Sequence, residues 1–167
     1  MATYAERAMD ALSGFLDSEL NDTLADLRTA LDITTLDLPD IEIIEPWYHR
    51  ASQSTKFTYM SLVIASSTGE SEPNSRFYSF EVDLGLVVLD KDIAGDEAAT
   101  MVAAWRYGDG IKTLFNRRIG GQGWTLGNAS GIIRATVDNQ VVGADPSLSA
   151  PNVALLTRVS IVTSEEY

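Results

Sequence analysis

Residues 96–121 read DEAATMVAAWRYGDGIKTLFNRRIGG, a stretch in which an apolar periodicity coincides with signals for both ends of a helix. Apolar side chains recur here at steps of three and four residues, which is the spacing of one helix face. Asp96 can accept a hydrogen bond from a free first-turn N–H, and Gly120 and Gly121 can end the helix after two arginines. We therefore predict a helix over residues 96–119. Its predicted buried stripe is Met101, Trp105, Gly108, Ile111 or Lys112, and Phe115, widened by Val102 and Leu114.

The segments around this helix predict a second helix and several strands. Residues 3–31 carry a leucine-rich stripe at helical spacing, so we expect a long amphipathic helix, with Gly14 and residues 21–23 as weak points. Pro39 and Pro46 stop the helical pattern, and residues 41–44 suggest a short extended segment. Strands are expected at residues 57–66, 76–89, 122–126, 131–137 and 153–163. The stripe of the first helix is Ala5, Met9, Leu12, Leu16, Leu20, Leu24, Leu27 and Leu31.

Residues 76–89 give the clearest strand pattern of the chain. Apolar residues occupy alternate positions from Tyr78 to Leu86, while Ser79, Glu81, Asp83 and Gly85 lie between them. The polar loop 67–75 joins this strand to the preceding one, which favours an antiparallel hairpin. The order helix, strands, helix, strands predicts one α+β domain over residues 1–167. We expect a mainly antiparallel β-sheet flanked by a long N-terminal helix and a second helix near 96–119.

The charge of the chain is strongly negative and unevenly distributed. Its net charge is −12, and residues 1–46 contribute eleven acids against two bases. Such a chain repels DNA on average, so we expect no specific DNA binding. No apolar run approaches the roughly 18 residues that span a bilayer, and the N-terminus lacks the basic start and apolar block of a signal peptide, so no membrane contact is expected. The chain has no cysteine, which excludes disulfides and thiolate chemistry.

Few residues suggest catalysis or metal binding. His49 is the only histidine, and it has no second histidine to share a metal and no nucleophile motif. Glu81 and Asp83 share one strand face, where they can hold a divalent cation or share a proton, although we favour a solvated strand face. The glycines after residue 119 close a helix instead of opening one, which disfavours a phosphate loop. We therefore expect no catalytic residue, no cofactor and no metal.

The predicted helix at 96–119 carries a cationic cluster. Four cations and one acid give it a local balance of +3, which indicates either a solvated helix face or a docking surface for an acidic neighbour. The acidic N-terminal helix of another copy is the obvious complement. Gly108 and Gly110 cost about 1 kcal/mol each relative to alanine, which suggests a close approach of another backbone or a local kink. The predicted interface residues are Arg106, Tyr107, Asp109, Lys112, Arg117 and Arg118.

The order of these elements resembles that of the tail terminator and neck (head–tail joining) proteins of long-tailed bacteriophages. The resemblance covers most of the chain as a pattern. It rests on the N-terminal helix, the extended stretch near Tyr48 and Arg50, the β-hairpin, and the helix with RYGDGIKTLFNRRIGG before the closing strands. Members of that group often carry an aromatic- and arginine-bearing helix, here with Arg106, Tyr107, Ile111 and Leu114, before a glycine-bearing turn at Gly120 and Gly121.

The resemblance implies a structural protein of the virion without catalytic residues. Such proteins form a closed ring, commonly of six copies, that caps the growing tail tube and offers its other face to the head connector. The implied partners are other copies of the chain, the tail tube protein and the head–tail connector protein, while DNA passes through the lumen without specific binding. A tail tube subunit or a head-completion connector is the alternative, and a small metal-dependent enzyme using Glu81, Asp83 and His49 is a remote one.

Overall fold

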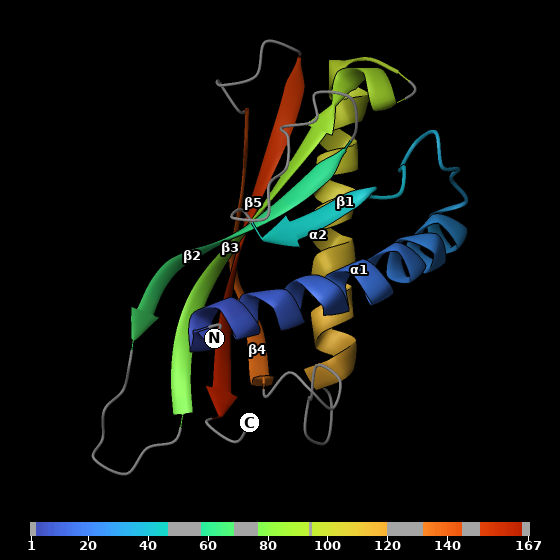
Figure 1. The fold of residues 1–167 in the computed structure, drawn as a ribbon. Helices are drawn as coiled ribbons and strands as arrows, with labels where there is room; N and C mark the ends of the chain where they lie inside the picture. Colours follow the sequence, from blue (N-terminus) through green and yellow to red (C-terminus); the bar gives the residue numbers. More distant parts are fainter. Residues whose placement is uncertain are drawn as a thin grey trace.

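The computed structural model describes residues 3–46, 58–68, 77–93, 95–119, 132–144 and 151–164. These residues form two long helices and a five-stranded sheet, so the predicted α+β class is confirmed (Figure 1). In chain order the elements are α1 (Tyr4–Leu31), β1 (Ile43–Pro46), β2 (Tyr59–Thr68), β3 (Phe77–Leu89), the short 3-10 turn η2 (Asp90–Asp92), α2 (Glu97–Ile119), β4 (Ile132–Gly143) and β5 (Asn152–Ser164).

Helix α1 is continuous from Tyr4 to Leu31, and both of its ends are capped. The Thr3 N–H donates to the Glu6 carboxylate at 2.6 Å, and the Glu6 N–H donates back to the Thr3 hydroxyl at 3.2 Å, which is a capping box. Asp32 ends the helix in the left-handed conformation, with φ of 52°. The predicted weak points at Gly14 and residues 21–23 do not interrupt the helix.

The sheet has the order β1-β2-β3-β5-β4. Strands β2 and β3 form the predicted antiparallel hairpin, and β5 is inserted between β3 and β4, antiparallel to both. Only the pair β1–β2 is parallel, which makes the sheet mixed but mainly antiparallel. The two edge strands of the described sheet are therefore β1 and β4, and the C-terminal strand is interior.

One face of the sheet carries the main core. The residues at even positions from Phe80 to Val88 on β3 are buried together with α1, α2 and the same face of β2, β4 and β5. Helix α1 packs mainly on β1 and α2 mainly on β4 and β5, and the helices cross and contact each other (Figure 1). The α1 stripe is buried as predicted from Met9 to Leu24, whereas its last member, Leu31, is 46% exposed.

Helix α2 occupies the predicted residues, but its buried face is rotated from the predicted stripe. Asp96 is the N-cap, since its side chain accepts a hydrogen bond from the Ala99 N–H at 3.1 Å. Trp105, predicted to be buried, is 57% exposed. Ala103, Ala104 and Tyr107 are buried in its place, while Ile111, Leu114 and Phe115 are buried as predicted. The buried side chains of α2 are Thr100, Ala103, Ala104, Tyr107, Ile111, Leu114 and Phe115.

The two interior glycines of α2 mark places where neighbouring side chains approach the helix. A Cβ on Gly110 would lie 2.7 Å from Cδ2 of Leu24 on α1. A Cβ on Gly108 would lie 3.0 Å from Oε1 of Gln140 on β4, whose Nε2 donates to the Gly108 carbonyl at 3.0 Å. The close approach that the sequence predicted is therefore present, but side chains make it, not another backbone.

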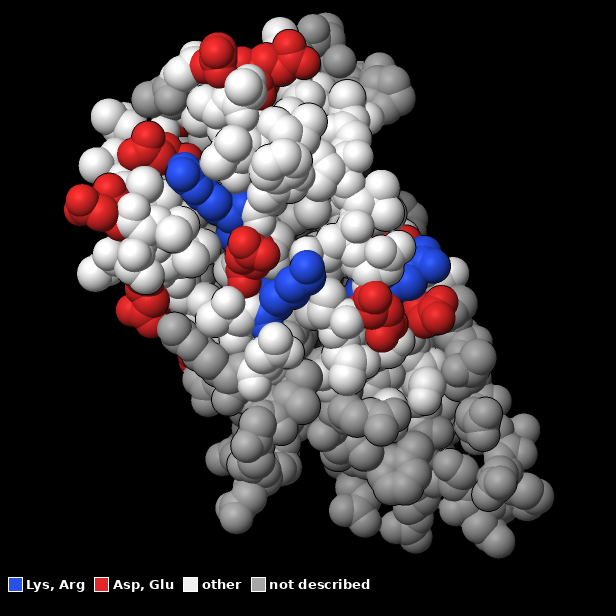
Figure 2. Space-filling model, turned by 180° about the vertical axis from the view of Figure 1, so that it is seen from behind, with Lys and Arg blue, Asp and Glu red and all other residues white. Residues whose placement is uncertain are grey.

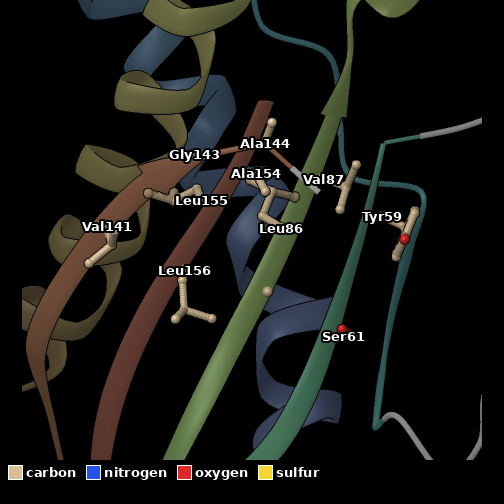
Figure 3. A pocket seen from close by; sticks show the side chains of 11 residues that line it. Tyr59, Ser61, Leu86, Val87, Val141, Gly143, Ala144, Ala154, Leu155 and Leu156 are labelled. Carbon is tan, nitrogen blue, oxygen red and sulfur yellow. The ribbon is translucent and has the colours of Figure 1, made fainter. Parts of the chain in front are cut away.

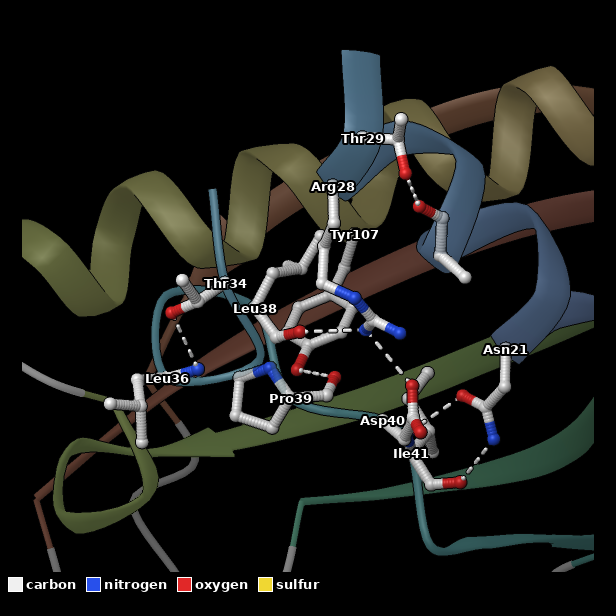
Figure 4. A network of polar contacts seen from close by, with 11 residues as sticks. Asn21, Arg28, Thr29, Thr34, Leu36, Leu38, Pro39, Asp40, Ile41 and Tyr107 are labelled. Carbon is white, nitrogen blue, oxygen red and sulfur yellow. Dashed lines mark hydrogen bonds and ion pairs between the residues drawn. The ribbon is translucent and has the colours of Figure 1, made fainter. Parts of the chain in front are cut away.

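Asn21, Arg28 and Tyr107 bind the segment after α1 to both helices, and we call these three side chains the clamp (Figure 4). Asn21 makes two hydrogen bonds to the main chain of Ile41, at 2.9 and 3.0 Å. Arg28 donates to the Leu38 carbonyl at 2.9 Å and pairs with Asp40 at 2.9 Å, while Tyr107 of α2 donates to the Pro39 carbonyl at 2.6 Å. This clamp positions residues 38–41 so that β1 can start beside β2.

Strand β4 is longer than predicted. The sequence predicted a strand at 131–137 and a polar stretch after it, whereas β4 extends from Ile132 to Gly143. The polar residues at 138–140 remain in the sheet because the register shifts between Val137 and Asn139, which accommodates Asp138 as an extra residue. The strand predicted at 122–126, His49, and the turn at Gly120 and Gly121 lie outside the described residues.

Candidate functional site

The predicted interface residues of α2 have different environments. Asp109 and Lys112 are exposed and Arg106 is partly exposed, so these three lie at the surface of the helix. Arg117 and Arg118 belong to α2, but their side chains lie outside the described part of the chain. The outward row of α2 also contains Trp105, which sequence reasoning assigned to the core.

Tyr107 is an exception among the predicted interface residues, because it belongs to the core. Its side chain is 1% exposed, and its hydroxyl donates to the Pro39 carbonyl. Burial raises the pKa of the Tyr107 phenol, since the phenolate loses hydration in this apolar position. Neighbouring helix positions point about 100° apart, so Tyr107 and Arg106 cannot share one face. The sequence placed them together because the predicted buried stripe passed through Trp105 and left Tyr107 outside it.

The turn after α1 contacts the outward side of α2. The Thr34 N–H and hydroxyl donate to the Asp37 carboxylate at 2.9 and 3.0 Å. These hydrogen bonds lower the pKa of Asp37, and the positive charge of Arg106 lowers it further. A shallow recess of about 310 Å³ lies between this turn and α2 and is lined by Asp37, Ile93, Ala98, Ala99, Val102 and Arg106.

The acidic helix and the cationic helix do not lie on opposite sides of the molecule. Helices α1 and α2 pack on the same face of the sheet and contact each other through Leu24 and Gly110. Figure 2 shows that the basic side chains on the face it displays are separated by acidic and uncharged ones, and they form no continuous basic patch there. If α2 of one copy paired with α1 of another, as the charges suggested, both contact surfaces would therefore lie in the helix layer of their copies.

Neither α1 nor α2 packs on the other face of the sheet. Its lower half is polar, and its centre is an ion pair between neighbouring strands, Asp83 on β3 and Arg158 on β5. Two hydrogen bonds of 2.8 and 3.0 Å join the guanidinium to both carboxylate oxygens. The hydrogen bonding and negative charge of Asp83 raise the pKa of Arg158, with smaller contributions from Glu81 and Asp138. Asp138 also accepts a hydrogen bond from Ser160.

The sequence suggested that Glu81 and Asp83 could hold a divalent cation or share a proton. The two residues do share one face of β3, but the Asp83 carboxylate is paired with the Arg158 guanidinium. Among the residues that the structure describes, no group of three or more histidine, cysteine, aspartate or glutamate side chains is arranged to hold a metal ion. None of the helices in the described ranges is long and apolar enough to cross a membrane.

The upper half of this face is apolar: Tyr59, Val87 and Leu89 form a small buried cluster there, and a hollow lies beside it. A depression of about 410 Å³ extends across β2, β3, β5 and β4, and Figure 3 shows α1 and α2 behind the strands, on the far side of the sheet. Gly85 lies in its lining beside Ser61, and Leu156 and Val141 are 42% and 54% exposed at it. Sequence reasoning missed this hollow, because the order of the strands determines which residues surround it.

Comparisons with known proteins assign no family to this chain. No protein-family model matches it, and no characterised protein matches its sequence significantly.

Proposed function

We propose that this chain is a structural virion protein that forms a closed ring at the head-proximal end of a phage tail. In this role the ring ends tail tube polymerisation and joins the tail to the head connector. The work is geometric, since a finite ring with unlike top and bottom faces can end one stack and start another assembly. The resemblance described above suggests this role, and the chain would act in the virion, at the junction of tail and head.

The observation that carries the proposal is the unequal covering of the two sheet faces. One face is buried under α1 and α2, while the other exposes apolar side chains such as Val141 and Leu156 beside a charged half. Exposed apolar side chains that lie together often mark a contact surface, because their contact with water is unfavourable. Repeated contact between copies would cover it.

The negative charge agrees with a lumen through which DNA slides. Binding to DNA draws its affinity from cations that neutralise phosphates, and this chain has an excess of twelve acids. We expect the purified protein to show no retention of duplex DNA at physiological salt.

Sedimentation velocity and native mass spectrometry of the purified protein, alone and mixed with tail tube protein from the same virus, test the proposal. A closed ring predicts one discrete oligomer and tubes that stop elongating when the ring is added. Open-ended fibres would indicate a tube subunit instead. A strict monomer in both samples would contradict the proposal.

A further inference from the structure

Two exposed apolar features lie on opposite sides of this molecule. The first is Trp105, the largest exposed apolar side chain among the described residues, which belongs to α2 in the helix layer. The second is the hollow of about 410 Å³ on the sheet face opposite α1 and α2. In a ring, each copy uses two different contact surfaces, and the first surface of one copy binds the second surface of the next copy.

We infer that Trp105 of one copy inserts into the sheet-face hollow of the next copy, and that this contact closes the proposed ring. The inference rests on the proposed function, and it names the two surfaces that the proposal leaves open.

The sizes of the two features are compatible. A cavity of about 150 Å³ lined by apolar side chains accepts benzene, so a hollow of about 410 Å³ has room for an indole. The hollow is lined mainly by apolar side chains, and Gly85 leaves space in it because it carries no side chain. Tryptophan and arginine are the residues that most often dominate protein–protein contacts, and Arg106 follows Trp105.

The charges around the two features are complementary. Asp109 and Lys112 lie on the same side of α2 as Trp105, one and two turns further along, whereas Arg106 faces Asp37. On the open face, Asp83 lies two residues before Gly85 on β3, about 7 Å along the strand. Glu81 and Asp138 add further negative charge around Arg158 there. Lys112 therefore approaches an acidic surface when the tryptophan enters the hollow.

The two features also lie at the same level of the sheet. Gln140 of β4 contacts the Gly108 carbonyl on the helix side, while the next residue, Val141, lines the hollow on the opposite side. Trp105 is three residues from Gly108, about 4.5 Å along the helix. With the ring axis along the strands, successive copies would meet without a step, which favours closure over an open helical fibre.

The test uses one variant for each surface. Trp105→Ala removes the inserted side chain, and Gly85→Val fills the hollow from a strand position where a Cβ meets Ser61 Oγ at 3.5 Å, an ordinary contact. If Gly85→Val fails to fold, Leu156→Glu places a charge at the exposed edge of the hollow instead. Leu31→Ala, an exposed leucine at the end of α1, is the matched control. Circular dichroism and thermal unfolding check that each variant is folded.

Sedimentation velocity and native mass spectrometry then compare assembly. Wild type and Leu31→Ala are expected to assemble alike, while Trp105→Ala and Gly85→Val each weaken association at least about 30-fold. A mixture of the two defective variants keeps one intact contact, because the tryptophan of one copy fits the open hollow of the other. The mixture is therefore expected to form one-to-one pairs that grow no further.

The possible failures are distinguishable. If wild type assembles and both variants assemble equally well, this inference is wrong and the ring proposal stands. If the variants are monomeric but their mixture does not pair, the contact is not between Trp105 and the hollow. If wild type remains monomeric under all conditions, including with tube protein, the proposed function fails and the inference fails with it.

Discussion

Gly14 and Gly110 allow one chemical change to be compared at two helix positions with opposite expected results. Both residues are replaced by alanine. On α1, Gly14 is exposed and a Cβ there meets nothing within 4 Å. Alanine should therefore stabilise the protein by about 0.5–1 kcal/mol, through helix propensity and a less flexible unfolded chain.

At Gly110 the same gain is opposed by crowding. The new Cβ would lie 2.7 Å from Cδ2 of Leu24, a side chain that is fully buried and cannot move without disturbing its neighbours. Overpacking of this kind costs about 1–3 kcal/mol, against a propensity gain of about 1 kcal/mol. We expect a net destabilisation between zero and about 2 kcal/mol, so the two variants should differ by about 0.5–3 kcal/mol.

Urea unfolding of the two single variants measures this difference. The melting temperatures of the two variants should also differ, by about 2–4 °C for each kcal/mol of difference in unfolding free energy. A double-mutant cycle isolates the contact, because Leu24→Ala removes the crowding atom and Gly110→Ala should then become stabilising by about 1 kcal/mol. Equal stabilisation by Gly14→Ala and Gly110→Ala in the wild-type background would refute the close contact between α1 and α2.

Three further perturbations test the clamp and the open face. Tyr107→Phe leaves the Pro39 carbonyl without its donor and should cost about 1–2 kcal/mol by urea unfolding. Because burial raises the pKa of Tyr107, wild-type stability should fall as pH rises above 10, and this fall should be shallower in Tyr107→Phe. Asn21→Ala should cost about 1–3 kcal/mol and speed hydrogen exchange at the Ile41 N–H. Arg158→Gln should leave the midpoint of urea unfolding nearly unchanged, since this ion pair is partly exposed.

The elements of the fold could largely be predicted from the sequence, because each depends on local periodicity. The α1 stripe, the alternation of β3 and the Asp96 cap are all properties of neighbouring residues. The extension of β4 could not be predicted in the same way. Its polar residues at 138–140 interrupt the pattern, and a register shift against β5 keeps them in the sheet.

The candidate surfaces were less predictable, because they depend on how distant segments pack. Trp105 and Tyr107 both fit an amphipathic helix, and the approach of Leu24 and Gln140 to the glycines determines which side of α2 faces inward. The hollow requires β5 to lie between β3 and β4, a topology that residue patterns do not specify. The even positions of β3 identified the buried face, but not that α1 and α2 both pack on this same face.

Electron microscopy of the assembled protein shows directly whether the chain forms a ring. We expect closed rings of a single copy number in end-on views, with the same ring at the ends of tail tubes when tube protein is present. Isolated single particles at every concentration, with and without tube protein, would contradict it.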